Sequence, residues 1–320
     1  MLRMPEFRYH APGTADDAVA MWHDLGDAMY IAGGTDLLPN IKHRLFTPKH
    51  VVGLSALPKA RVVDAGDHWR IPGGTTLAEL AKNTDIPTPL ALAASKVAGP
   101  QIRNMGTLGG NVLLDTRCLF YNQTAFWRKA LGHCLKAEGD WCHVIGGPKT
   151  CVAAQSSDTV PVLLTLDASI ELLGPEGTRQ LNLRDLYRFN GMDHLKLDKG
   201  ELLTTVTVPK PAEGFRGTYK KLRVRDSIDF PQLGVAIAST WDGPALTSLD
   251  IVVGAAAPIP KPIKKLDAFC GAPLTDEGID AIAELVRKGT RPNEAVQGDV
   301  AWRRMMAGIF TRRALSDLRG

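Results

Sequence analysis

The pattern Ile-x-Gly-Gly-Thr occurs twice in this chain of 320 residues, at positions 31–35 and 71–75. Each copy follows a short apolar stretch and precedes a segment with helical periodicity, so each predicts a strand, a tight turn and a helix. Glycine has no side chain, so it permits both the sharp turn and a close approach of other backbone or of a ligand. The repetition predicts two small α/β lobes in the first part of the chain.

Two local signals support this organisation. Thr14, followed three residues later by Asp17, is typical of a helix N-terminus, and the apolar residues that follow share one helical face. Further on, the segment around Gly66 predicts a hairpin, because glycine interrupts two short strand-like stretches.

The remainder of the chain predicts a second domain of different architecture. A change of composition at 208–217 marks the boundary, so we expect domains at 1–212 and 213–320. The expected elements of the second domain are antiparallel strands at 218–241 and 248–258 and amphipathic helices at 278–289 and 299–318. The predicted class is α+β.

Composition excludes several classes of function. The net charge is only +4 and the 38 Lys and Arg are spread along the chain, so no basic stripe predicts nucleic-acid binding. The N-terminus has no apolar signal-peptide core, and no run of about 18 apolar residues predicts a membrane span. We therefore expect a cytoplasmic protein, in which clustered cysteines are more typical of metal ligands than of disulfides.

Two glycine-rich loops are candidates for binding an anion. The loop at 31–38 contains Gly33 and Gly34, and the loop at 106–111 contains the polar residues Thr107 and Asn111. Neither matches the G-x-G-x-x-G or G-x-x-x-x-G-K-[ST] pattern, so neither a Rossmann nor a P-loop assignment holds. Either loop alone can be a simple turn, but two in one domain favour a dinucleotide.

Four motifs carry a resemblance to a known family. They are AGGTDLL at 32–38, IRNMGTLGGN at 102–111, SSDTVPVLLTLDA at 156–168 and YKKLRVRDSIDFPQLGVAIA at 219–238. In this order they resemble the flavin-binding subunit of the molybdenum hydroxylases, the xanthine dehydrogenase family. The resemblance implies a two-lobed FAD-binding domain of the PCMH type, followed by a domain like the C-terminal domain of CO dehydrogenase flavoproteins.

The resemblance also implies which residues bind FAD. The first loop would hold the pyrophosphate, and further contacts to the flavin would come from the second loop, the aspartate segment and the C-terminal domain. The residues implied are Ile31, Ala32, Gly33, Gly34, Thr35, Asp36, Leu37, Leu38, Thr107, Gly110, Asn111, Asp158 and Lys220. Taken from the residues alone, Asp158 could instead cap the following helix, and Lys220 could be a solvated strand residue.

An additional segment, at about 115–155, separates the second loop from the aspartate segment. It carries Cys118, Cys134, Cys142 and Cys151, whereas the fifth cysteine, Cys270, is expected to be a small buried apolar residue. Their spacing fits neither a zinc knuckle nor the tight cysteine run of small ferredoxins. Spacing alone leaves a [4Fe–4S] cluster, a structural zinc and unliganded surface cysteines all open.

Neighbouring side chains suit a metal site. The aromatic residues Phe126, Trp127 and Trp141 could shield a cluster from water, and His133 or His143 could replace one cysteine as a ligand.

A flavin subunit with a cysteine-bearing segment at this position resembles those of the 4-hydroxybenzoyl-CoA reductases. That resemblance implies a [4Fe–4S] cluster on the four cysteines and an enzyme of three kinds of subunit, paired as a dimer of heterotrimers. The partners would be a large molybdopterin subunit and a small subunit with two [2Fe–2S] clusters, and ferredoxin would donate electrons. The implied reaction is the reductive removal of the phenolic hydroxyl group to give benzoyl-CoA, in anaerobic aromatic degradation.

No residue of this chain is expected to act as a catalytic acid or base, because the cofactors carry the chemistry. The segment would admit single electrons from ferredoxin to the flavin. The alternatives are a molybdenum hydroxylase that acts on a heterocycle or a different aromatic thioester, and a zinc-stabilised flavoprotein used for assembly.

Overall fold

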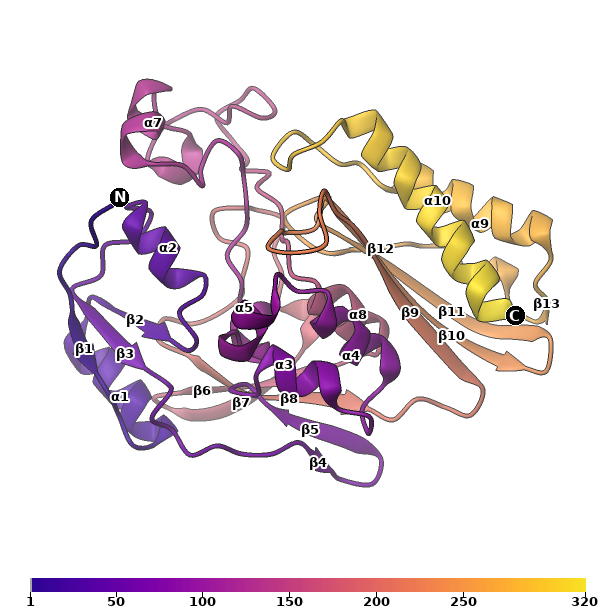
Figure 1. The fold of residues 1–320 in the computed structure, drawn as a ribbon, viewed down its shortest axis with the longest axis horizontal. Helices are drawn as coiled ribbons and strands as arrows, with labels where there is room; N and C mark the ends of the chain where they lie inside the picture. Colours follow the sequence, from indigo (N-terminus) through magenta and orange to yellow (C-terminus); the bar gives the residue numbers. More distant parts are fainter. Residues whose placement is uncertain (1) are drawn as a thin grey trace.

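The computed structural model describes residues 2–320 and contains three β-sheets with helices packed between and around them (Figure 1). The sheets follow one another along the chain. The second sheet contains strands that precede the cysteine segment and strands that follow it. The architecture confirms the predicted α+β class with a C-terminal antiparallel sheet. No helix in the described part of the chain combines the length and apolar character needed to span a bilayer.

The N-terminal lobe is a three-stranded parallel sheet of order β1-β3-β2. The predicted N-cap is confirmed, because the Thr14 hydroxyl accepts a hydrogen bond of 3.1 Å from the Asp17 N–H. Ala18 and Val19 of the capped helix are buried against the sheet. The elements are β1 (Arg8–His10), α1 (Ala15–Leu25), β2 (Ala28–Ile31), α2 (Leu37–Lys42) and β3 (His50–Gly53).

The second lobe is a five-stranded sheet of order β4-β5-β8-β6-β7, covered by helices that carry much of the largest core cluster. The predicted hairpin is present, and Gly66 adopts the left-handed φ of 96° that its turn requires. The strands are β4 (Val63–Asp64), β5 (His68–Pro72), β6 (Ser169–Gly174), β7 (Gly177–Asn182) and β8 (Leu202–Pro209). The helices are α3 (Leu77–Lys82), α4 (Thr88–Ser95), α5 (Pro100–Met105), α6 (Leu108–Val112), α8 (Thr159–Thr165) and the short 3-10 helix η2 (Leu183–Asp185).

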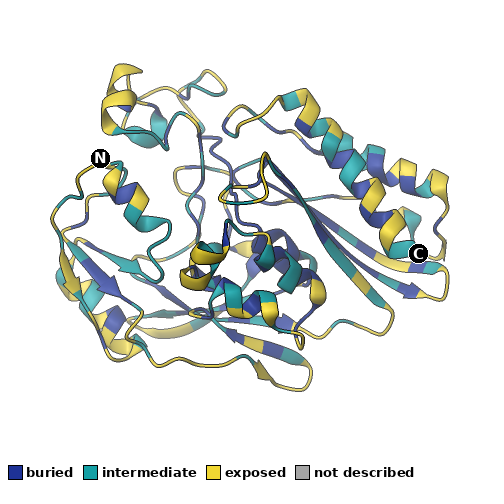
Figure 2. Cartoon of the chain, in the orientation of Figure 1, coloured by how far each residue is buried: buried dark blue, intermediate teal, exposed yellow. Residues whose placement is uncertain are grey.

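The C-terminal domain is an antiparallel sheet with helices on both faces. Its main path is β12-β11-β10-β9; α10 packs on one face of β9 and β10, and α4 and α8 of the second lobe pack on the other. Figure 2 shows that buried residues concentrate in α8 and along these strands. The elements are β9 (Phe215–Leu222), β10 (Leu233–Asp242), β11 (Ala245–Gly254), β12 (Lys261–Pro262), η3 (Asp267–Phe269), β13 (Ala272–Pro273), α9 (Asp276–Gly289) and α10 (Val300–Arg319).

The cysteine segment contains only α7 (Ala125–Ala130) and the 3-10 helix η1 (Leu135–Ala137), and α7 stands apart from the sheets and is largely exposed (Figures 1 and 2). The buried guanidinium of Arg128 fastens it to the N-terminal lobe by donating to the carbonyl oxygens of His43 and Arg44 at 3.1 and 2.8 Å. The Leu119 N–H donates to the carbonyl of Ala295 at 2.9 Å. The segment therefore contacts both the first lobe and the C-terminal domain.

Candidate functional site

The two glycine loops lie against each other. A Cβ atom built on Gly33 would be 1.8 Å from the backbone oxygen of Met105, the last residue before the second loop. A Cβ on Gly106 would lie 3.5 Å from the hydroxyl oxygen of Thr35. Loops that are about 70 residues apart in the sequence are therefore in direct backbone contact, and this contact requires glycine at position 33.

The first loop presents a row of free donors. Among residues 2–320, the backbone N–H groups of Ala32, Gly33, Gly34, Thr35 and Asp36 have no hydrogen-bond acceptor. The loop is half-buried, and Gly34 has a left-handed φ of 68°, which turns the chain from β2 towards α2. Consecutive N–H groups without acceptors suit an anion such as a pyrophosphate, so residues 31–38 fit the FAD group that the resemblance implies.

The second loop is held by its own side chains. The Thr107 hydroxyl caps α6 by accepting from the Gly110 N–H at 3.1 Å. The Asn111 side-chain oxygen accepts from the hydroxyl groups of Ser157 and Thr159 at 2.6 and 2.7 Å. Asn111 thereby joins the second loop to the start of α8. Sequence reasoning missed both hydroxyl residues, although they flank Asp158.

Replacing Asn111 by Leu should lower the free energy of unfolding by about 1–3 kcal/mol, because two buried hydroxyl groups lose their shared acceptor. Urea denaturation of the full chain measures this change. The control is Asn104→Leu on α5, where the side chain is exposed, and its effect should stay within about 0.5 kcal/mol. Equal destabilisation by both substitutions would contradict the role of Asn111.

Asp158 is buried, with 3% of its surface exposed, and it does not cap α8. Its carboxylate accepts from the Tyr219 hydroxyl at 2.7 Å and from the Lys221 ammonium at 2.9 Å. Burial raises the pKa of the Asp158 carboxyl, and these two donors oppose the rise. The capping role considered from the residues alone is therefore wrong.

Lys220 does not lie with the other proposed flavin contacts. It pairs with Asp317 of α10 at 2.5 Å on the opposite face of β9, whereas its neighbour Lys221 reaches Asp158. The reason is the period of two along a strand, which places Tyr219 and Lys221 on the same face. Sequence reasoning missed Lys221, and the buried Tyr219 two residues earlier was the signal that could have identified it.

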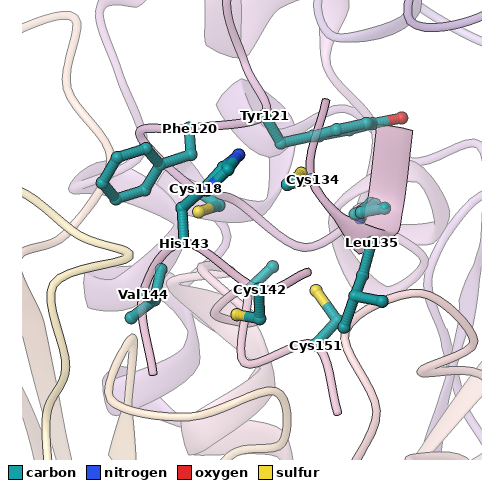
Figure 3. Close-up of a pocket in the computed structure, with 11 residues that line it drawn as sticks. Cys118, Phe120, Tyr121, Cys134, Leu135, Cys142, His143, Val144 and Cys151 are labelled. Carbon is teal, nitrogen blue, oxygen red and sulfur yellow. The ribbon is translucent and has the colours of Figure 1, made fainter. Parts of the chain in front are cut away.

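The four cysteines of the segment line one pocket. Cys118, Cys134, Cys142 and Cys151 are only 5–8% exposed, and Figure 3 shows them around the pocket on separate stretches of loop. They are free thiols. The reading as surface cysteines is therefore wrong.

Electrostatics in this pocket disfavour a bare thiolate. Burial raises the pKa of the Cys118 thiol to about 12 and also raises the pKa of Cys151. Lys136 lines the same pocket, but its ammonium pairs with Asp115 at 2.6 Å. Across residues 2–320, no three His, Cys, Asp or Glu side chains are arranged to hold a metal ion.

The neighbouring aromatic residues lie elsewhere than expected. Phe126 is 83% exposed, and Trp127 and Trp141 are also exposed, so the expectation that they shield the pocket is wrong. Phe120 and Tyr121, which precede α7, line the pocket instead (Figure 3). For Phe126 and Trp127 the reason is that α7, which carries both, stands clear of the pocket.

The two histidines also differ in position. His143 lines the pocket, and its Nε2 atom is buried without a hydrogen-bond partner in the described structure. His133 is exposed and contacts the Ala137 carbonyl oxygen at 3.0 Å. Only His143 is therefore placed to supplement the cysteines.

Comparisons with known proteins agree with this geometry. Residues 5–211 match the family model of the FAD binding domain in molybdopterin dehydrogenase, and residues 217–318 match that of the CO dehydrogenase flavoprotein C-terminal domain. The aldehyde oxidoreductase FAD-binding subunit PaoB of Escherichia coli (strain K12) is 33% identical over 83% of this chain and 86% of its own length.

The carbon monoxide dehydrogenase medium chain of Afipia carboxidovorans is 29% identical over 97% of this chain and 95% of its own. A crystal structure of the Cu,Mo-CO dehydrogenase superposes with a TM-score of 0.80 at 27% identity, covering 99% of both chains. This chain therefore belongs to the family of FAD-binding subunits, or medium chains, of the molybdopterin-dependent dehydrogenases.

Proposed function

We propose that this chain carries electrons between the molybdopterin site of a large partner subunit and an outside redox partner, through FAD held by the loops at 31–38 and 106–111. The observation that carries the proposal is the contact between these two loops, which brings the first loop and its five free N–H groups against Met105 and Gly106. FAD exchanges electrons in pairs or singly, so it can join a two-electron reaction to single-electron carriers. The residues of this chain bind and orient it.

We further propose that the cysteine pocket holds a [4Fe–4S] cluster. The four thiols are free and buried, and burial raises the pKa of Cys118 and Cys151. Thiols must lose their protons to become ligands, and iron supplies the positive charge that stabilises the thiolates. A single zinc ion needs all four thiolates about 2.3 Å from one point, whereas a cube binds each thiolate at a different corner. In residues 2–320, no three potential ligands are arranged around a single point where one metal ion could bind. This geometry argues against zinc more than against a cluster.

The cluster proposal predicts different results for two cysteines. Cys142→Ser should remove most of the iron and acid-labile sulfide, of which the native chain should hold about four each. Cys270→Ser is the matched control, since Cys270 lies in the C-terminal domain with its thiol against the Leu266 carbonyl. Metal analysis and the visible spectrum measure both. A native chain that contains one zinc and no iron would refute the cluster.

The proposed partners are a large molybdopterin subunit and a small subunit with two [2Fe–2S] clusters, in a dimer of heterotrimers. For the substrate we place aldehydes first, because the 33% identical relative is an aldehyde oxidoreductase subunit. Oxidation of an aldehyde to a carboxylic acid takes its oxygen atom from water and releases two protons and two electrons, and the electrons leave through this chain.

Reductive dehydroxylation of 4-hydroxybenzoyl-CoA with reduced ferredoxin is the second candidate, and the additional cysteine segment is the feature that favours it. This reaction consumes two electrons, so they enter through this chain. Assays of the purified complex separate the candidates: one set supplies an aromatic aldehyde and an electron acceptor, and the other supplies 4-hydroxybenzoyl-CoA and reduced ferredoxin. Activity in only the second set would overturn the aldehyde proposal.

A further inference from the structure

Arg117 lies at the neck of the cysteine segment, by which we mean the place where the two ends of this segment pair with each other. Its backbone pairs with Ala154 in both directions, and both N–H···O bonds measure 2.8 Å. The segment therefore leaves and rejoins the fold at one point. Because Cys118 follows directly, the position of Arg117 depends on how the segment is folded around its pocket.

The Arg117 side chain reaches the first glycine loop. Its guanidinium forms an ion pair with Asp36 and donates to the Asn40 side-chain oxygen at 3.3 Å. The Asn40 amide in turn donates to Asp36 at 2.9 Å. Asp36 precedes α2 but makes no capping bond with its side chain. Its carboxylate instead contacts the side chains of Arg117 and Asn40.

The charges explain why the contact matters. A carboxylate beside five N–H groups that suit a pyrophosphate repels that anion, and the guanidinium neutralises the carboxylate. The Arg117 side chain is only 14% exposed and lies 4.4 Å from the centre of the Phe230 ring of the C-terminal domain. A guanidinium stays protonated at neutral pH, so Arg117 carries a positive charge.

We propose that Arg117 is a positioning residue that couples the cysteine pocket to the FAD loop. A segment folded around its cluster holds Arg117 against Asp36, and the neutralised loop then binds FAD more tightly. The inference rests on the proposed function, because it needs both cofactors in this chain. By linkage the effect is reciprocal, so bound FAD also favours the filled pocket.

The test compares FAD affinity with and without iron. Full-length native chain is prepared iron-loaded and iron-depleted by chelation, and FAD is titrated while flavin fluorescence is followed. The iron-loaded chain should bind FAD at least about five-fold more tightly, the lower end of typical allosteric coupling. In Arg117→Met the difference should fall below about two-fold, and Arg117→Lys, which keeps the charge, should restore part of it.

Two further variants make the result specific. Arg188→Met removes an exposed ion pair with Asp193, so it should retain the native iron response. In the Asp36→Asn background, Arg117→Met should change FAD affinity less than it does alone, because the charge to be neutralised is gone. Circular dichroism verifies that each variant is folded.

The outcomes separate the two proposals. A native chain without FAD refutes the proposed function, and a native chain without iron refutes the proposed cluster; the coupling is refuted in either case. If the native chain holds both iron and FAD, but its FAD affinity is the same with and without iron, only the coupling is overturned. An unchanged iron response in folded Arg117→Met and Arg117→Lys variants would also overturn the role of Arg117.

Discussion

Gly33→Ala should reduce FAD affinity by at least about 100-fold. A Cβ at this position would be 1.8 Å from the backbone oxygen of Met105, and neither backbone can yield without separating the two glycine loops. Overpacking costs about 1–3 kcal/mol and occasionally more, and a 1.8 Å approach to backbone places this site at the upper end. Each 1.4 kcal/mol is a factor of ten in affinity. Titration of the full chain with FAD, followed by flavin fluorescence, measures the loss.

Gly74→Ala is the matched control, because Gly74 belongs to the second Ile-x-Gly-Gly-Thr pattern. A Cβ on Gly74 would meet no atom within 4 Å. FAD affinity and stability should therefore remain close to those of the native chain. If Gly33→Ala also binds FAD normally, the contact between the two loops is not what forms the flavin site.

Lys221→Met should lower the free energy of unfolding by about 3–5 kcal/mol, because it leaves the buried Asp158 carboxylate without its cation. Burial already raises the pKa of Asp158, and the loss of Lys221 raises it further. A carboxyl whose pKa is raised on folding stabilises the protein below its unfolded pKa of about 3.9, and this contribution is lost as the pH rises. The defect of the variant should therefore grow from acid to neutral pH in urea denaturation.

Lys220→Met tests the adjacent lysine on the opposite face of β9. Its partner Asp317 is 63% exposed and Lys220 itself is 33% exposed, so the change should be within about 0.5–1 kcal/mol. Similar destabilisation by the two variants would contradict the assignment of Lys221 as the partner of Asp158.

Local sequence signals predicted the elements of this fold well. The Thr14 cap, the hairpin at Gly66 and the strands and helices of the C-terminal domain depend on neighbouring residues and on periodicity, which a sequence displays directly. The family of the chain was also predictable, because its four motifs occur in the same order as in that family.

The pairing of side chains was less predictable. The resemblance indicated Lys220, but the pleat of β9 turned Lys221 towards Asp158. Aromatic residues near the cysteines in the sequence were expected to cover the pocket, yet Phe126 faces solvent on α7. Both cases concern the direction of a side chain, which depends on what each face of the element packs against.

The sequence by itself determined the two glycine loops, the four clustered cysteines and the α+β class, because these follow from residue types and local spacing. Only the tertiary structure decided that Gly33 packs on Met105 and that Arg117 joins the neck of the cysteine segment to Asp36. Contacts between distant residues arise when separate elements pack on a shared core, and no local pattern encodes which side chains then meet.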